Sequence, residues 1–235
     1  MRKAVASLIF IIAVLLLLPL FTLTIRESEI DNEWALWLIN GKNPLPQGYQ
    51  PELASIGSWS ENGQNRYLDS RVAPYALQMM SAASEAGLFL DPASAYRNIS
   101  TQETNFRNEF NNWLKKGYSR QEAFDLTMRV IAAPGTSEHN AGLSIDFTPY
   151  ETRFEQKPEF AWLLENAHKY GFILRYPKYS VDITGISYEP WHWRFVGVYH
   201  AGKIRESELT LEEYIGICAG DESVVRSWRT ELGLF

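Results

Sequence analysis

The chain has 235 residues, enough for one membrane segment and one globular domain of about 200 residues with an ample core. Its formal net charge of −6 argues against nucleic acid as a partner, because nucleic-acid binding usually requires a basic surface. A single cysteine, Cys218, excludes an internal disulfide and a zinc cluster built from several thiolates.

The chain begins with a basic and then apolar segment. Arg2 and Lys3 precede a predominantly apolar run from Ala4 to Ile25. As a helix, this run would reach about 33 Å, enough to cross the hydrocarbon core of a bilayer. It ends without a small-x-small cleavage site. We therefore expect residues 1–26 to form an uncleaved membrane anchor; the alternative is a signal peptide that is removed before secretion.

The flanking charges set the expected orientation. The positive-inside rule places Arg2 and Lys3 in the cytoplasm and the remaining chain outside the membrane. Residues 27–60 follow as an irregular lead-in rich in proline and glycine. Because its apolar side chains are too many for a free linker, we expect Leu36 to Asn40 to add a strand or short helix to the domain. The stretch NPLPQGYQP, residues 43–51, should wrap the domain surface.

Residues 61–219 carry helix signals at several places. Apolar spacing predicts a helix over residues 72–83. Further helix starts are predicted from capping-box pairs at Ser100 and Glu103, at Ser119 and Glu122, and at Thr210 and Glu213, and from Pro158 at a first helical position. The tail at 220–235 is ambiguous.

Three short apolar runs are typical of strands. They are LSIDFT at 143–148, FILRY at 172–176 and HWRFVGV at 192–198. Helices thus cluster in the first half of the domain and strands in the second. This order predicts an α+β fold with a small, mostly antiparallel sheet.

Two of these strand runs adjoin candidate metal ligands. His139, Asp146 and His192 would supply two imidazoles and one carboxylate, which leaves a fourth zinc position open for water. Glu189, three residues before His192, could take a proton from that water. The spacing of His139 and Asp146 is a weak signal by itself, and Asp146 could instead pair with an arginine. A turn near Gly142 would let Asp146 point back toward His139.

The segments around these residues resemble a known family. SEHNAGLSIDF at 137–147 and YEPWHWRFVG at 188–197 are similar to the two signature segments of the VanY-type D-alanyl-D-alanine carboxypeptidases, which are zinc metallopeptidases. SAYRNISTQ at 94–102 resembles a third segment of that family. The resemblance covers about residues 35–216 and implies a Hedgehog/DD-peptidase-like α+β fold.

The resemblance implies roles for the site residues. His139, Asp146 and His192 would bind Zn²⁺, and Glu189 would act as the general base; the alternative for Glu189 is a supporting contact to His192. Arg97 would meet the substrate, through either a terminal carboxylate or the developing oxyanion, unless it forms a surface ion pair. Four further residues are expected at the substrate: Ser137 and Gln102 as contacts, and Tyr96 and Trp191 as pocket wall or core. Arg175 and Arg194 are expected to be structural, each paired with a carboxylate.

The implied function is a zinc carboxypeptidase in the bacterial cell envelope that removes the C-terminal D-alanine from peptidoglycan stem peptides. Three alternatives stay open: an L,D-carboxypeptidase acting on tetrapeptide stems, a cell-wall endopeptidase, and a non-catalytic wall-binding module. The intact Glu189 and ligand set argue against the last, because a binding module needs no general base.

Overall fold

The computed structural model describes residues 33–148 and 152–220. The expected membrane anchor and the tail after Gly220 lie outside these residues. Among the described residues, no helix combines the length and apolar character needed to cross a membrane. The chain divides into two units, Met1–Trp37 and Leu38–Phe235. In the first unit, the described structure is the short 3-10 helix η1, Glu33–Leu36.

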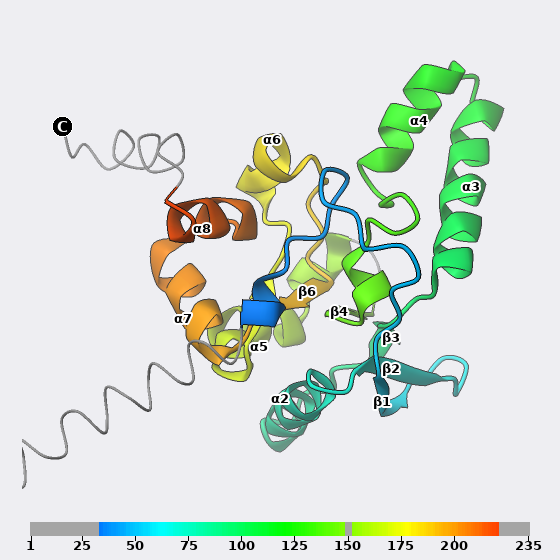
Figure 1. The fold of residues 1–235 in the computed structure, drawn as a ribbon. Helices are drawn as coiled ribbons and strands as arrows, with labels where there is room; N and C mark the ends of the chain where they lie inside the picture. The colour runs from blue at the N-terminus through cyan, green and yellow to red at the C-terminus, as the bar shows by residue number, and fades with distance from the viewer. Residues whose placement is uncertain (1–32, 149–151, 221–235) are drawn as a thin grey trace, which may run out of the picture. The chain divides into compact units, whose positions relative to one another are not determined.

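The second unit is built around a four-stranded antiparallel sheet, which confirms the predicted α+β class (Figure 1). Its strands are β3 (Pro92–Ser94), β4 (Ser144–Phe147), β5 (Phe172–Leu174) and β6 (His192–Phe195), in the order β3-β4-β6-β5. The register places Asp146 opposite His192 in the central pair β4–β6. Every residue of these two strands is buried, so both faces of the sheet centre are covered.

The two faces of the central strands differ in polarity, because successive side chains of a strand point to opposite faces. Trp193 and Phe195 lie on the apolar face of β6, where the Trp193 ring is 6.3 Å from Phe160 and the Phe195 ring is 5.0 Å from Tyr75. His192 and Arg194 lie on the other face. That polar face carries the site described below.

The helices frame this sheet. They are α2 (Ala73–Glu85), α3 (Ile99–Lys115), α4 (Arg120–Met128), α5 (Pro158–Asn166), α6 (Val181–Thr184), α7 (Val198–Ser207) and α8 (Leu211–Cys218). Short 3-10 turns complete them: η2 (Glu138–Ala141), η3 (Thr152–Gln156), η4 (Ala167–Tyr170) and η5 (Lys178–Ser180). Phe160 of α5 and Tyr75 of α2 cover the apolar face of the sheet. The helices α3 and α4 pack as a pair, with the Phe106 and Phe124 rings 5.9 Å apart (Figure 1).

Most helix-end predictions are confirmed, and one is wrong. The capping boxes of α4 and α8 form as predicted from Ser119 with Glu122 and from Thr210 with Glu213. At α3, however, the cap is Asn98, whose side chain accepts from the backbone N–H of Thr101 at 2.7 Å. The helix therefore begins before the predicted Ser100–Glu103 pair, because the extended backbone of Asn98 already supplies the cap.

Three predictions about strands and the lead-in need correction. A hairpin of β1 (Leu53–Ser58) and β2 (Asn65–Asp69) occupies a region that carried no strand prediction. Most of its side chains are exposed, so the sequence shows little alternation. The expected element at 36–40 reduces to η1, which ends at Leu36, and an isolated bridge between Asn40 and Asn43. The run 192–198 is a strand only to Phe195, and α7 begins at Val198.

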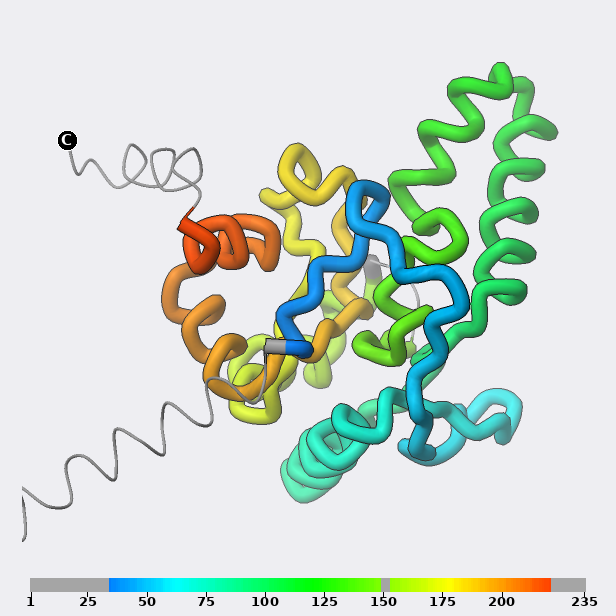
Figure 2. The backbone as a smooth tube through the Cα atoms, viewed as in Figure 1, coloured from blue at the N-terminus to red at the C-terminus, as the bar shows by residue number. Residues whose placement is uncertain are grey.

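The predicted wrapping of residues 43–51 is confirmed at Leu45. This side chain is buried, and its backbone N–H donates to the carbonyl of Gly135 at 2.8 Å. Figure 2 shows the segment in blue, running beside the green chain that leads into η2. The lead-in thus supports the turn that carries the first histidine of the site.

Candidate metal centre and catalytic cleft

The first histidine is held by a tight turn. His139 lies in η2, and the Oγ of Ser137 accepts from its backbone N–H at 3.3 Å. Gly142 ends this turn in the left-handed region, with φ at 68°. A Cβ at Gly142 would lie 2.6 Å from the backbone nitrogen of Asp69, so both the conformation and the space require glycine. The chain then enters β4, as the sequence predicted.

Three side chains converge on the polar face of the sheet. Asp146 of β4 lies opposite His192 of β6, and η2 places His139 beside both. Asp146 Oδ2 is 3.1 Å from His139 Nε2, and Asp146 Oδ1 is 3.0 Å from His192 Nδ1. Each of the three residues offers one potential ligand atom, and these three atoms lie within 4.8 Å of one another. The structure therefore brings together the three predicted ligands.

This set fits a zinc ion. Asp146 Oδ1 is buried and makes no hydrogen bond of acceptable geometry within the described part of the chain, although His192 Nδ1 is close to it. The far nitrogens of both imidazoles are occupied: His139 Nδ1 lies 2.7 Å from the Ala95 carbonyl, and His192 Nε2 lies 3.1 Å from Glu138 Oε2. These contacts leave His139 Nε2 and His192 Nδ1 facing the carboxylate of Asp146. Metal-bound histidines are usually oriented in this way, by a hydrogen bond from the ring nitrogen that does not bind the metal. Two nitrogens and one carboxylate make a three-ligand zinc set.

The charges of the three residues suit a cation. Burial would raise the pKa of Asp146, but His139 and His192 outweigh it and hold that pKa well below its usual range. Burial lowers the pKa of His139 and favours the neutral imidazole that a metal needs. Burial also disfavours charge on His192, yet the adjacent carboxylates of Asp146 and Glu138 raise its pKa to about 10. A metal ion would replace that proton.

Glu189 lies beside the three ligands without belonging to the set. Its Oε2 is 3.7 Å from His192 Nδ1, and the side chain is buried. Burial raises the pKa of Glu189 to about 8, although the neighbouring His192 opposes the shift. A carboxyl group with a raised pKa next to a metal site has the properties of a general acid or base.

Arg97 lies next to the centre and lines the same cleft as Glu189. Its Nη2 lies 4.0 Å from Asp146 Oδ2 and donates to Ser94 Oγ at 2.9 Å, and its Nη1 donates to Gln102 Oε1 at 3.0 Å. Gln102 is itself fixed by donation to the Ala132 carbonyl at 2.6 Å. The alternative of a surface ion pair for Arg97 is therefore wrong, because its side chain is mostly buried and its guanidinium is held next to the site by Ser94 and Gln102.

A cleft of about 440 Å³ opens over these residues. Ser137, Gln102 and Trp191 line it, whereas Tyr96 is absent from its described lining and instead donates its backbone N–H to the Tyr67 carbonyl of β2. One further wall comes from α3, through the polar side chains of Asn105, Asn108, Glu109 and Asn112. The other two histidines of the chain lie outside the set: His168 is in η4, and His200 has its Nδ1 2.8 Å from the Tyr214 hydroxyl.

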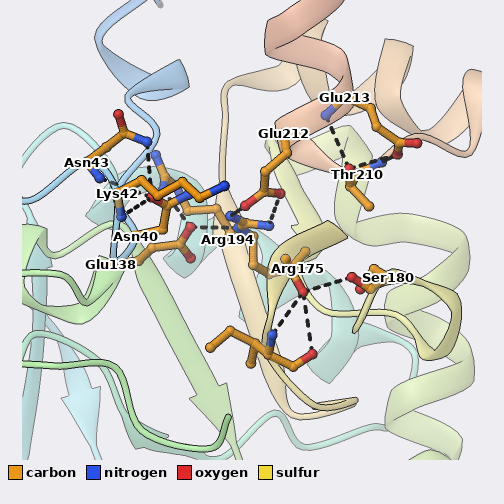
Figure 3. A network of polar contacts seen from close by, with 12 residues as sticks. Asn40, Lys42, Asn43, Glu138, Arg175, Ser180, Arg194, Thr210, Glu212 and Glu213 are labelled. Carbon is orange, nitrogen blue, oxygen red and sulfur yellow. Dashed lines mark hydrogen bonds and ion pairs between the residues drawn. The ribbon is translucent and has the colours of Figure 1, made fainter. Parts of the chain in front are cut away.

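The sequence predicted no role for two residues that lie at the site. Tyr176 lines the cleft, with its ring centre 5.0 Å from that of His192. Glu138 also lines the cleft and contacts His192, Arg175 and Arg194. Figure 3 shows Glu138 with the two arginines. The arginine pairing was predicted and is confirmed. Two features of the sequence pointed to Glu138: it directly precedes the candidate ligand His139, and two arginines in predicted strands needed a carboxylate partner.

Comparisons with known proteins agree with this geometry. The family model described as VanY, D-alanyl-D-alanine carboxypeptidase, matches residues 65–198. A D-alanyl-D-alanine carboxypeptidase of Enterococcus faecalis is 36% identical over 192 residues, which cover 82% of this chain and 69% of that protein.

Solved structures extend the likeness to the fold. A variant of the vancomycin-resistance D,D-pentapeptidase VanY from a VanB-type cassette, in complex with Zn(II), matches with a TM-score of 0.68 and 38% identity over 78% of this chain and 99% of that one. The LD-carboxypeptidase LdcB matches with a TM-score of 0.66 and 34% identity over 76% and 84%. The chain described here belongs to the VanY D-alanyl-D-alanine carboxypeptidase family.

Proposed function

We propose that this chain is a zinc-dependent carboxypeptidase that hydrolyses the C-terminal D-alanine from peptidoglycan stem peptides. The observation that carries the proposal is the convergence of His139, Asp146 and His192 at one cleft, with Glu189 beside them. Family membership and the Zn(II) complex of a 38% identical relative support the same reading.

The proposed chemistry divides between the metal and the protein. Zinc, when bound, supplies a Lewis acid that polarises the scissile carbonyl and lowers the pKa of water. Glu189 accepts a proton from the attacking water at its carboxylate and returns it to the leaving amine nitrogen. Burial of Glu189 favours its protonated form, which helps it to hold the proton between the two transfers.

Arg97 recognises the substrate in this proposal. A carboxypeptidase must bind the free C-terminal carboxylate, and a guanidinium braced by Ser94 and Gln102 offers a fixed cation at the edge of the centre. Gln102 then acts by holding Arg97. Ser137 and Trp191 contribute cleft wall next to the ligands.

The main rival is an L,D-carboxypeptidase, because LdcB matches nearly as well as the D,D-enzyme. Incubation of the zinc-loaded protein with pentapeptide and tetrapeptide stems separates the two. Release of the terminal D-alanine from the pentapeptide, identified by mass, supports the proposal. Release from the tetrapeptide alone supports the rival, and cleavage within cross-linked stems supports an endopeptidase.

We further propose that the catalytic domain lies outside the cytoplasm, attached by the N-terminal segment. The apolar run at 4–25 with Arg2 and Lys3 before it supports this location, as does a substrate found in the cell wall. High-pH carbonate should leave the protein in the membrane pellet, and external protease should reach the domain in spheroplasts. A mature N-terminus beyond residue 20 would show secretion after cleavage instead.

A further inference from the structure

Behind His192 lies a fully buried group of charges. Glu138 places Oε2 3.1 Å from His192 Nε2, while its Oε1 accepts from Arg175 Nε at 2.7 Å and from Arg194 Nη1 at 2.9 Å. The side chains of Glu138, Arg175 and Arg194 are at most 1% exposed. Such a group is costly to bury unless every member is paired, so these contacts restrict each side chain to one arrangement.

The group continues to α8, the last helix of the described residues. Arg175 Nη1 and Nη2 donate to the two carboxylate oxygens of Glu212 at 2.8 and 2.6 Å, a forked pair (Figure 3). Glu212 lies in the first turn of α8, which begins after its cap at Thr210. Side-chain contacts therefore connect α8 to the imidazole of His192 through Glu212, Arg175 and Glu138. We call these four residues the relay.

The two imidazoles of the centre are held differently. The far nitrogen of His139 meets a neutral backbone carbonyl, that of Ala95. The far nitrogen of His192 meets a carboxylate whose other oxygen is fixed by two arginines. A carboxylate at Nε2 keeps the proton there, leaves the Nδ1 lone pair facing Asp146, and prevents the ring from rotating.

We propose that Glu138 is a positioning residue that fixes the tautomer and orientation of His192 for zinc, and that Glu212 of α8 supports it through Arg175. The inference uses the proposed assignment of His192 as a zinc ligand and deepens it. In this arrangement, α8 contributes to metal affinity although its residues are remote from the cleft.

The alternative is that the relay only holds α8 and the strands together. Zinc affinity, measured by competition with a chromophoric chelator, separates the two roles from stability, measured by thermal unfolding. Loss of an outer partner of a metal-bound histidine typically costs about 10–100-fold in affinity. We expect E138Q to fall in that range and E212Q to show a smaller loss in the same direction.

Glu213 offers a matched control on the same helix. It is adjacent to Glu212, but its carboxylate caps Thr210 and contacts neither Arg175 nor Glu138 among the hydrogen bonds of the described chain. E213Q should lower the thermal midpoint through the weakened cap while leaving zinc affinity unchanged. E212Q should also lower the thermal midpoint, because it weakens the pair with the buried Arg175, but it should in addition lower zinc affinity.

Three outcomes decide the proposal. A folded E138Q protein with the parental zinc affinity would overturn it. If E138Q does not fold, the pair E212Q and E213Q decides: equal zinc affinities overturn the relay, and a selective loss in E212Q supports it. Because the readout is metal binding, a wrong substrate assignment would leave the result standing, whereas H192A retaining zinc would overturn the ligand assignment itself.

Discussion

On β6, His192 and Arg194 face Glu138 and the metal centre, whereas Trp193 and Phe195 face the aromatic side chains of α2 and α5. All four residues are buried, so exposure does not distinguish the functional face from the core face. The difference lies in what each face must satisfy. The core face needs mainly shape and apolar area, and its one polar group on β6, the Trp193 indole N–H, donates to the Pro190 carbonyl. On the other face, every side chain carries polar atoms that need a partner or a ligand.

The largest expected effect is the loss of zinc and turnover when a side chain of the polar face is removed. His192→Ala should remove most of the zinc, from about one equivalent per chain in the parent, and abolish turnover, because it deletes one of three ligands. The fold should persist, since Glu138 keeps both arginine partners. Elemental analysis and circular dichroism measure the two properties.

The neighbouring substitution provides the contrast. Trp193→Ala should cost about 3–5 kcal/mol in the free energy of unfolding, measured with denaturant, because it leaves a cavity in the core. Zinc binding in whatever fraction stays folded should be retained. A protein that loses zinc equally in both variants, or keeps full zinc in His192→Ala, would contradict the separation of the faces.

Some features of the sheet and the site could be predicted from the sequence, and others could not. Three of the four sheet strands and the three ligands were found because apolar runs and the family-like segments stand out in the sequence, whereas the three-residue strand β3 carried no strand prediction. His139 and Asp146 alone were a weak signal, and their meeting depends on the Gly142 turn. Glu138 was missed because nothing local reveals that β5 and β6 bring Arg175 and Arg194 beside it. The β1–β2 hairpin was missed because its pattern of burial is sparse.

The next prediction tests whether Glu189 acts as a general base and not as a zinc ligand. Glu189→Gln should keep zinc and fold but lower kcat by about 10²–10⁴, the usual contribution of general acid–base catalysis. Glu165→Gln, an exposed carboxyl change on α5, is the control and should leave kcat unchanged. A near-normal kcat in Glu189→Gln would make Glu189 a supporting contact to His192 and require another base.

Without the metal, the free energy of unfolding should depend on pH through the buried titratable groups of the polar face. In the metal-free fold, the pKa of His192 is about 10 and that of Glu189 about 8, both above their unfolded values. Groups with raised folded pKa values stabilise the fold at low pH and lose this contribution as pH rises toward the folded pKa. From pH 7 to about 8 both groups, and from pH 8 to 9 mainly His192, should lower the free energy of unfolding, each by at most about 1.4 kcal/mol per pH unit. Denaturant unfolding of the chelator-treated protein should show this decline, and zinc should reduce it; a flat profile without zinc would contradict it.

The smallest effect concerns Arg97, which stands at the edge of the polar face and not within it. If it binds the substrate carboxylate, Arg97→Ala should reduce kcat/KM on free-acid peptides by about 10–150-fold, since a lost hydrogen bond to a charged group costs about 1.5–3 kcal/mol. The parent enzyme should already cleave a C-terminally amidated peptide poorly, and the substitution should affect that substrate much less. Arg107→Ala, which removes an exposed arginine from α3, is the matched control and should change neither rate. Equal losses on acid and amide peptides would place Arg97 at the developing oxyanion instead. Efficient amide cleavage by the parent enzyme would contradict exopeptidase action, because an enzyme that needs the terminal carboxylate cannot tolerate its replacement.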